Sequence, residues 1–261
     1  MLASLLLSRR SMLEPCVLGS EWLRPSAPRP APSPRDRLGR HMALRFPGAL
    51  SASERAGHVA AVVAARSSWT ANFKGRQFTL GRAYYTHLEE DREDEYFDRA
   101  EASDALVRRA APGLQEQMLA LAAALLDGPV VQRPGWCGPG VHVFPAQGEV
   151  ARRGGEVHFD TEGLTYPQID RRAPAVSIVL MLQRPDVGGG LRLWDRFYEG
   201  EDFPEKPEPD VPVTQIQYEP GEMVVFDSYR LHQILPFRGR TDRISATMHA
   251  CLEGAVWQVW F

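Results

Sequence analysis

After Gly128 the sequence is divided into short apolar segments separated by glycine, proline and aspartate, and this pattern limits the folds open to the chain. Such spacing is typical of many short strands joined by turns. In the longest segment, alternate residues from Val176 to Leu182 are aliphatic and share one strand face. Strands are predicted at Val141–Phe144, Glu156–Asp160, Ala175–Gln183, Leu191–Asp195, Val213–Tyr218, Glu222–Phe226, Leu231–Pro236 and Arg243–Leu252.

The preceding half of the chain predicts helices. Ser51 and Glu54 have the spacing of a capping box. A later apolar stripe indicates a core-facing helix, which Gly128 is placed to end. The stripe consists of Leu114, Met118, Leu121 and Leu125. Because such helices need a sheet to bury their stripes, we expect a single domain over residues 47–261.

The predicted fold is mainly β with N-terminal helices. Residues 47–128 are expected to be a helical support, and residues 129–261 a jelly-roll core buttressed by it. Residues 1–46 hold eight arginines and only three acidic residues, with the proline-rich run Arg24–Arg37. A disordered basic extension is predicted there. The acidic run Glu89–Asp98 is expected to be a solvated loop or helix face.

Charge and cysteine content restrict the possible partners. The formal net charge of −3 argues against broad nucleic-acid binding. The apolar start of the chain is too short to span a membrane, so no membrane partner is expected. Cys16, Cys137 and Cys251 are too few and too scattered for a disulfide framework, which favours a reducing, cytoplasmic location. The sequence gives no indication of the oligomeric state.

His158 and Asp160 lie two residues apart in a predicted strand, so their side chains project from one face. His232, which follows another predicted strand, is the candidate third ligand. Two histidines and one carboxylate can form a facial triad, which leaves the opposite metal positions open and favours non-haem Fe(II) chemistry with oxygen. For His158 and Asp160 alone, a surface His–Asp pair is the alternative.

Arg243, Ser245 and Thr247 are predicted to share one face of the final long strand. An arginine fork beside a hydroxyl suits a carboxylate, and inside a barrel this would belong to a cosubstrate. Arg238 and Arg240 are alternatives, but they precede the strand in a predicted turn, where exposure is expected.

Three sequence segments resemble the Fe(II)/2-oxoglutarate-dependent dioxygenase superfamily, and its prolyl-hydroxylase-like branch in particular. They are "HFD" at His158–Asp160, "GGGLRLWD" at Gly188–Asp195 and "PGEMVVFDSYRLHQILPFRGRTDRIS" at Pro220–Ser245. Their order matches the branch pattern of His-x-Asp, a Gly-Gly-x-Leu strand, Pro-Gly-x, a distal histidine and Arg-x-Ser. The resemblance covers roughly residues 141–252.

The resemblance implies a double-stranded β-helix and a set of site residues. His158, Asp160 and His232 would bind Fe(II), while Arg243 would pair with the distal carboxylate of 2-oxoglutarate, assisted by Ser245. With O2, such an enzyme oxidises an unactivated C–H bond and releases succinate and CO2. Halogenating relatives replace the carboxylate ligand with a small residue, so the intact Asp160 favours hydroxylation.

Other residues near the predicted site are weaker candidates. Arg152 and Arg153, in a glycine-containing loop, could meet an anionic substrate or could be solvated. Glu162 could reach the surroundings of the metal or the substrate, and Trp194 could wall the pocket or pack in the core. Two strand histidines are expected to be ordinary barrel residues, although the second could line the cosubstrate pocket. They are His142 and His249.

The expected function is an Fe(II)/2-oxoglutarate-dependent oxygenase that hydroxylates a small molecule, such as an amino acid or a biosynthetic intermediate. A peptide or protein hydroxylase is the alternative with the same chemistry. A cupin-like metal isomerase and a non-catalytic metal-binding barrel are alternatives from other classes. The segment Glu219–His232 resembles the end of a cupin motif, but cupins usually carry His-x-His where this chain has His158 and Asp160.

Overall fold

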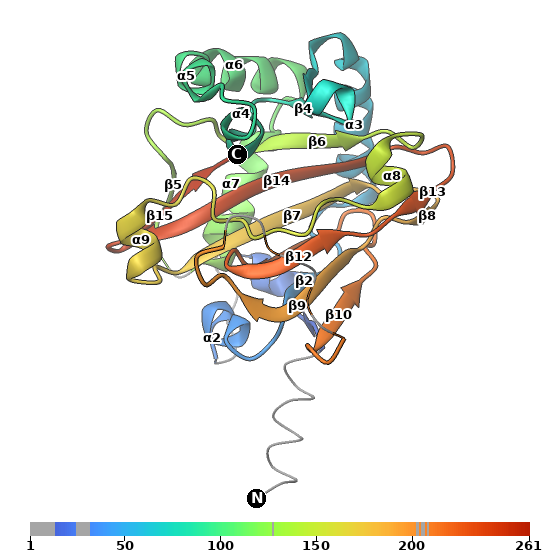
Figure 1. The fold of residues 1–261 in the computed structure, drawn as a ribbon. Helices are drawn as coiled ribbons and strands as arrows, with labels where there is room; N and C mark the ends of the chain where they lie inside the picture. The colour runs from blue at the N-terminus through green and yellow to red at the C-terminus, as the bar shows by residue number, and fades with distance from the viewer. Residues whose placement is uncertain (1–13, 25–31, 127, 202–203, 205–206, 208) are drawn as a thin grey trace, which may run out of the picture.

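The computed structural model describes residues 14–24, 32–126, 128–201, 204, 207 and 209–261. Its central feature is a large, mainly antiparallel sheet with strand order β1-β2-β11-β7-β14-β6-β4-β3, extended by β15 and β5 beside β14 (Figure 1). The strands of this sheet are β1 (Cys16–Val17), β2 (Leu44–Phe46), β3 (Thr70–Asn72), β4 (Gln77–Leu80), β5 (Val130–Gln132), β6 (Gly140–Phe144), β7 (Ala175–Gln183), β11 (Met223–Asp227), β14 (Arg243–Glu253) and β15 (Val256–Trp260).

A smaller antiparallel sheet lies across one face of the large sheet (Figure 1). Leu191 and Leu193 of the small sheet pack against Met181, Val224 and Phe226 of the large sheet, which joins the two layers. The order of the small sheet is β10-β9-β12, and a separate two-stranded ribbon pairs β13 with β8. These strands are β8 (Val187–Gly188), β9 (Leu191–Phe197), β10 (Val213–Ile216), β12 (Arg230–Ile234) and β13 (Phe237–Arg238).

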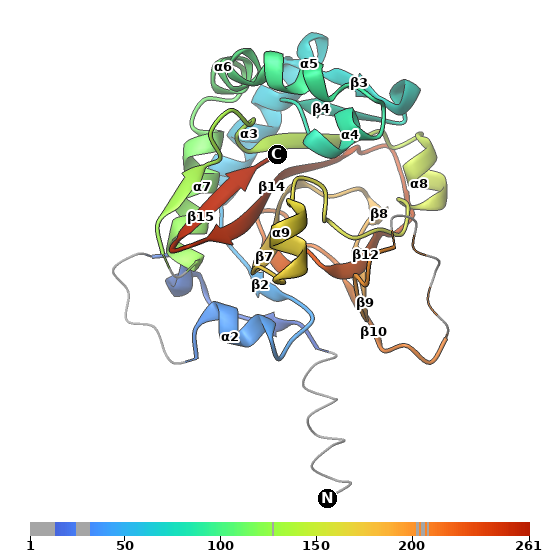
Figure 2. The same ribbon diagram turned by 60° about the vertical axis from the view of Figure 1, so that its left-hand side comes forward.

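Helices cover the opposite face of the large sheet, as the two ribbon views show (Figures 1 and 2). Residues of α3, α6 and α7 join one apolar cluster with the sheet, including Val62, Val107 and Met118. The α-helices are α2 (Pro34–Leu38), α3 (Ala52–Ala64), α4 (Tyr84–Leu88), α5 (Glu93–Asp98), α6 (Ala100–Ala110), α7 (Leu114–Leu125), α8 (Glu149–Arg153) and α9 (Tyr166–Asp170), with short 3-10 turns at Ser20–Leu23, Arg66–Ser68 and Phe73–Gly75. No helix among these described residues is long and apolar enough to cross a membrane.

Strict alternation along β14 separates the core from the site. Ile244, Ala246 and Met248 belong to the apolar cluster beneath the helices. Arg243, Ser245, Thr247 and His249 line a cavity on the other face. Successive side chains of a strand point to opposite faces, so a single strand both holds the helices and builds the cavity floor.

The expectation of a disordered extension through residue 46 is wrong for the part that the structure describes. Strand β1 pairs in parallel with β2, and Ser33 caps α2 through a capping box with Asp36. Trp22 is buried in the main apolar cluster, which gives this segment a hydrophobic reason to pack. The expectation for residues 1–13 and 25–31 lies outside the described residues.

The predicted strand Glu156–Asp160 is also wrong, because only one bridge forms there, between His158 and His232. The backbone N–H of Asp160 donates to Ser228 at 2.9 Å, while that of Gly155 donates to Ile234 at 2.9 Å. The segment therefore follows β12 without a continuous ladder. It still places His158 beside His232, which is what the site needs.

Candidate metal centre

The two triad histidines are held in the same orientation by backbone carbonyls. His158 Nδ1 lies 2.9 Å from the carbonyl oxygen of Glu156, and His232 Nδ1 lies 2.9 Å from that of Arg230. A carbonyl only accepts, so each Nδ1 carries a proton and donates it. Both Nε2 atoms are thereby left facing the cavity, in the arrangement that metal-binding histidines use.

Asp160 faces both Nε2 atoms. Its carboxylate oxygens lie 3.5 Å from His158 Nε2 and 3.3 Å from His232 Nε2. One ligand atom from each of the three residues falls within 4.8 Å of the others, and they form the group of potential metal ligands found in the described part of the chain. Neighbouring ligands at about 2.1 Å from one metal ion lie about 3 Å apart, so this cluster has the size of a three-ligand site.

Residues behind the triad fix the carboxylate. The hydroxyl of Ser177, on β7, donates to Asp160 Oδ2 at 2.5 Å. The same hydroxyl lies 2.9 Å from the hydroxyl of Ser228 and 3.2 Å from His249 Nδ1. Hydrogen-bonded partners of this kind orient metal ligands, and their loss commonly weakens metal binding.

Charge interactions within the triad shift its ionisation. Burial would raise the pKa of Asp160, but interactions with His232 and His249 and hydrogen bonds from the triad histidines outweigh it, so the pKa lies well below its usual range. Burial would lower the pKa of His158, but the hydrogen bond and charge of Asp160 raise it to about 9. The carboxylate is therefore ionised at neutral pH, as a metal ligand must be.

The triad opens into a cavity of about 400 Å³ between the two sheets. Arg243 lies at the cavity floor, is 2% exposed, and donates to Ser245 Oγ at 3.2 Å and to the carbonyl oxygen of Gly189 at 3.0 Å. Burial lowers the pKa of Arg243, and Tyr218 opposes that shift. Across the described residues, no carboxylate forms a salt bridge with it. A buried cation without an anion is costly, so the floor is suited to an anionic ligand.

The sequence matches no family model and no curated protein. Solved structures do match the fold. One is a novel N-substituted L-amino acid dioxygenase from Burkholderia ambifaria AMMD, with 14% identity, a TM-score of 0.53 and coverage of 87% of this chain and 90% of that one. Another is the non-heme alpha ketoglutarate dependent epimerase SnoN from nogalamycin biosynthesis, with 14% identity, a TM-score of 0.52 and coverage of 84% of this chain and 82% of that one. This chain shares their fold.

The weaker site candidates fall into two groups: some line the cavity, and others lie outside it. Glu162 lines the cavity, and burial, with the charge of Asp160 adding to it, raises the pKa of Glu162 to about 7. Arg153 lines the rim, whereas Arg152 is exposed and donates to the carbonyl oxygen of Gln147 at 2.7 Å. Trp194 packs with Phe159 and Leu231 in a different cluster, away from the cavity. Of the alternatives to Arg243, both Arg238 and Arg240 are exposed.

Several residues that line the cavity or support the triad could not be predicted from the sequence. Glu89 belongs to the acidic run predicted as solvated, yet it lines the cavity. Ser177 and Ser228 had no distinguishing pattern. His142 was expected to be an ordinary barrel histidine, but it is 7% exposed, lines the cavity, and its Nδ1 has no hydrogen-bond partner among the described residues. Burial lowers the pKa of His142 to about 3, so its ring is neutral.

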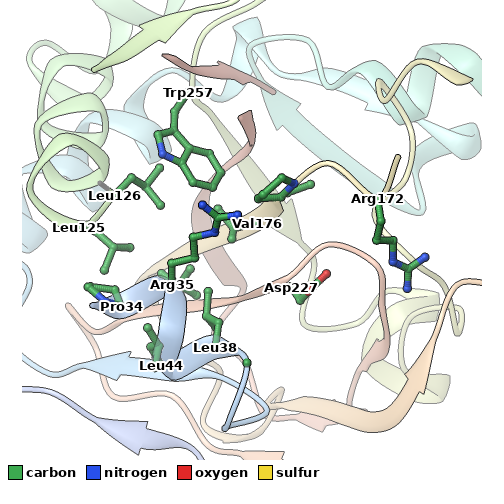
Figure 3. A pocket seen from close by; sticks show the side chains of 14 residues that line it. Pro34, Arg35, Leu38, Leu44, Leu125, Leu126, Arg172, Val176, Asp227 and Trp257 are labelled. Carbon is green, nitrogen blue, oxygen red and sulfur yellow. The ribbon is translucent and has the colours of Figure 1, made fainter. Parts of the chain in front are cut away.

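A second cavity, of about 240 Å³, lies on the helix-covered side of the large sheet (Figure 3). It is lined by Leu38 of α2, Leu125 of α7, Val176 of β7 and Trp257 of β15. It contains none of the triad residues. The triad and Arg243 therefore lie together in the larger cavity, between the sheets.

Proposed function

We propose that this protein is an Fe(II)- and 2-oxoglutarate-dependent oxygenase. One observation carries the proposal. The three-ligand cluster of His158, Asp160 and His232 shares a cavity with Arg243, which is buried and has no carboxylate partner among the described residues. Two histidines and a carboxylate suit Fe(II), and a guanidinium at the floor suits the distal carboxylate of a dicarboxylic cosubstrate. A cupin-like isomerase would need the triad but has no use for this arginine.

The residues present fit both groups. His158 and His232 would bind Fe(II) through Nε2 and Asp160 through a carboxylate oxygen, while Arg243 and Ser245 would hold 2-oxoglutarate. When bound with O2, these groups supply the oxidation of an unactivated C–H bond, with release of succinate and CO2. The chain's own part is to hold its ligands in one orientation, to fix the cosubstrate carboxylate, and to keep the target carbon close to the metal ligands.

The proposal includes finer features. We place the chain in the prolyl-hydroxylase-like branch, with the two sheets forming a double-stranded β-helix, and we favour hydroxylation because Asp160 retains its carboxylate. We propose a small-molecule substrate, such as an amino acid or biosynthetic intermediate, rather than a nucleic acid or a membrane. The proposal of a small-molecule substrate is supported by the fold that this chain shares with the N-substituted L-amino acid dioxygenase. A cytoplasmic setting completes the proposal.

The first experiment measures succinate. Purified protein with Fe(II), ascorbate and 2-oxoglutarate is expected to release succinate slowly even without a substrate, and His158→Ala should reduce the rate at least a hundredfold. His58→Ala is the matched control, since His58 lies on α3 and its Nε2 is 2.8 Å from Gln117 Oε1, away from the cavity. If the metal-loaded protein forms no succinate under any condition, the oxygenase proposal is wrong.

A further inference from the structure

The rim of the site cavity carries more negative than positive charge. Outside the triad and Arg243, its charged lining residues are four glutamates and two arginines. Both arginines are already engaged: Arg76 Nε lies 2.9 Å from Glu149 Oε2, and Arg153 Nη1 lies 3.4 Å from Glu149 Oε1. Glu149 therefore neutralises one of these two positive charges, and each of the two arginines among the described rim residues already has a carboxylate partner.

The other three rim glutamates are Glu89, Glu156 and Glu162. None of them takes part in a salt bridge within the described segments. They gather around one triad histidine: Glu89 interacts electrostatically with His158 and Glu156, and Glu162 with His158 and Glu89. Three carboxyl groups without an arginine or lysine partner among the described residues thus lie together where a substrate would enter.

The fold holds Glu162 in place. Gly163, the next residue, has a φ of +87°, and a Cβ there would lie 2.6 Å from Trp260 Nε1. Only glycine permits this close approach with a positive φ. The chain is therefore pressed against Trp260, which lines the same cavity with Tyr84 and Tyr85. An aromatic wall beside an acidic group is the usual setting for an organic cation.

His142 gives independent evidence that the cavity receives a polar ligand. Its ring lies in the cavity, 5.7 Å from the ring of Tyr85, and its Nδ1 is buried without a partner in the described part of the chain. An unpaired buried polar atom costs free energy unless a ligand satisfies it. A neutral imidazole can accept a hydrogen bond from an N–H donor.

Resting on the proposed function, we propose that the substrate is a small molecule with a protonated amine, which Glu162 binds at the cavity rim beside the metal triad. Glu89 and Glu156 add to the attractive field, and the aromatic wall of Tyr84 and Trp260 contacts the carbon skeleton. The rim selects a cation. This replaces the expectation that Arg152 or Arg153 binds a substrate carboxylate.

The test measures binding of probes with one carbon skeleton and different charge, by titration calorimetry. The protein is first loaded with Mn(II) and 2-oxoglutarate, so that the triad and Arg243 are already occupied. Butylamine, butanol and butanoate form one set, and 2-phenylethylamine, 2-phenylethanol and 3-phenylpropanoate form a second, larger set. In at least one set the amine should bind at least tenfold more tightly than the alcohol, and the carboxylate should bind most weakly. If no set places the amine first, the proposal is overturned.

Two variants locate the effect. Glu162→Gln keeps the shape of the side chain and should remove at least tenfold of the amine preference. Glu116→Gln, an exposed acid on α7 outside the cavity, should leave the preference unchanged. An unchanged preference in Glu162→Gln overturns the assignment. Succinate release by the wild-type protein is measured separately. If the protein prefers the amine but forms no succinate, only the oxygenase proposal is rejected. If it forms succinate but does not prefer the amine, only the cation site is rejected.

Discussion

Arg243 is the residue whose environment demands a ligand most directly. Its guanidinium is buried, donates to the hydroxyl of Ser245 and the carbonyl oxygen of Gly189, and faces the cavity. Hydrogen bonds to charged groups contribute about 1.5–3 kcal/mol. We expect Arg243→Gln to raise the KM for 2-oxoglutarate roughly tenfold to a hundredfold, measured as succinate formation against cosubstrate concentration.

The exposed Arg240 supplies the matched control. Arg240→Gln removes the same charge from the turn before β14, and it should leave the KM for 2-oxoglutarate within about twofold of wild type. Equal effects from the two substitutions would show a general charge effect and would contradict the role given to Arg243.

Because His142 is buried, we expect the free energy of unfolding to decrease at acidic pH. Burial lowers its pKa from 6.5 in the unfolded chain to about 3 in the folded protein. Between these values the unfolded state binds a proton that the folded state does not, so the contribution is constant above pH 6.5 and stability falls as pH drops below it. The loss is up to about 1.4 kcal/mol per pH unit.

Urea unfolding of the metal-free protein at pH 7, 6, 5 and 4.5 measures this term. His142→Asn should show a shallower decline in the free energy of unfolding than wild type. The comparison cancels the titration of neighbouring groups such as His249 and Asp160, which both variants retain. Parallel declines would mean that His142 does not carry the effect.

At the scale of single elements, helix α3 has a defined start. Ser51 accepts from the backbone N–H of Glu54, and Glu54 accepts from the backbone N–H of Ser51. Loss of such a cap costs about 1 kcal/mol. Ser51→Ala should therefore lower the free energy of unfolding by about that amount in urea, whereas Ser67→Ala, at an exposed position beyond the helix, should change it little.

Elements with strong local patterns could be predicted from the sequence. The Ser51 cap, the buried stripe of α7 and the alternation along β7 and β14 appear where the pattern places them. Local physics decides such features: a cap needs one turn, and alternation needs one strand.

Other elements depend on distant partners. Strands β3 and β4 lie in the half predicted to be helical, and β4 exists by pairing with β6. The short strand β1 owes its place to β2. No local pattern indicates such pairings, because strands of two to four residues carry little periodicity.

The site divides in the same way. His158 with Asp160, and Arg243 with Ser245, follow from the two-residue repeat of extended chain. Glu89 reaches the cavity only because α4 sits over it, and Ser177 meets Asp160 across the sheets. Contacts between segments far apart in sequence are set by tertiary packing, which the spacing of residues along one segment does not encode.

For the whole molecule, ligand binding should raise stability. A ligand that binds only the folded state stabilises it by about 2.7 kcal/mol at a hundred times its Kd. Thermal unfolding with Mn(II) and 2-oxoglutarate should therefore shift Tm upward by several degrees, and EDTA should reverse the shift. His232→Ala should abolish the response to metal; a full response in that variant would place the metal elsewhere.

The hydrogen bond from Ser177 to Asp160 connects the metal ligands to the large sheet. The histidine ligands belong to the small-sheet side, where His158 bridges to β12, while the carboxylate ligand is hydrogen-bonded to β7 of the large sheet. A metal bound by the two histidines and the carboxylate would therefore connect the small sheet to the large sheet. If one sheet shifted over the other, the angle between the carboxylate and the imidazoles would change. A bound metal would therefore oppose any change in the separation of the sheets and in the width of the cavity.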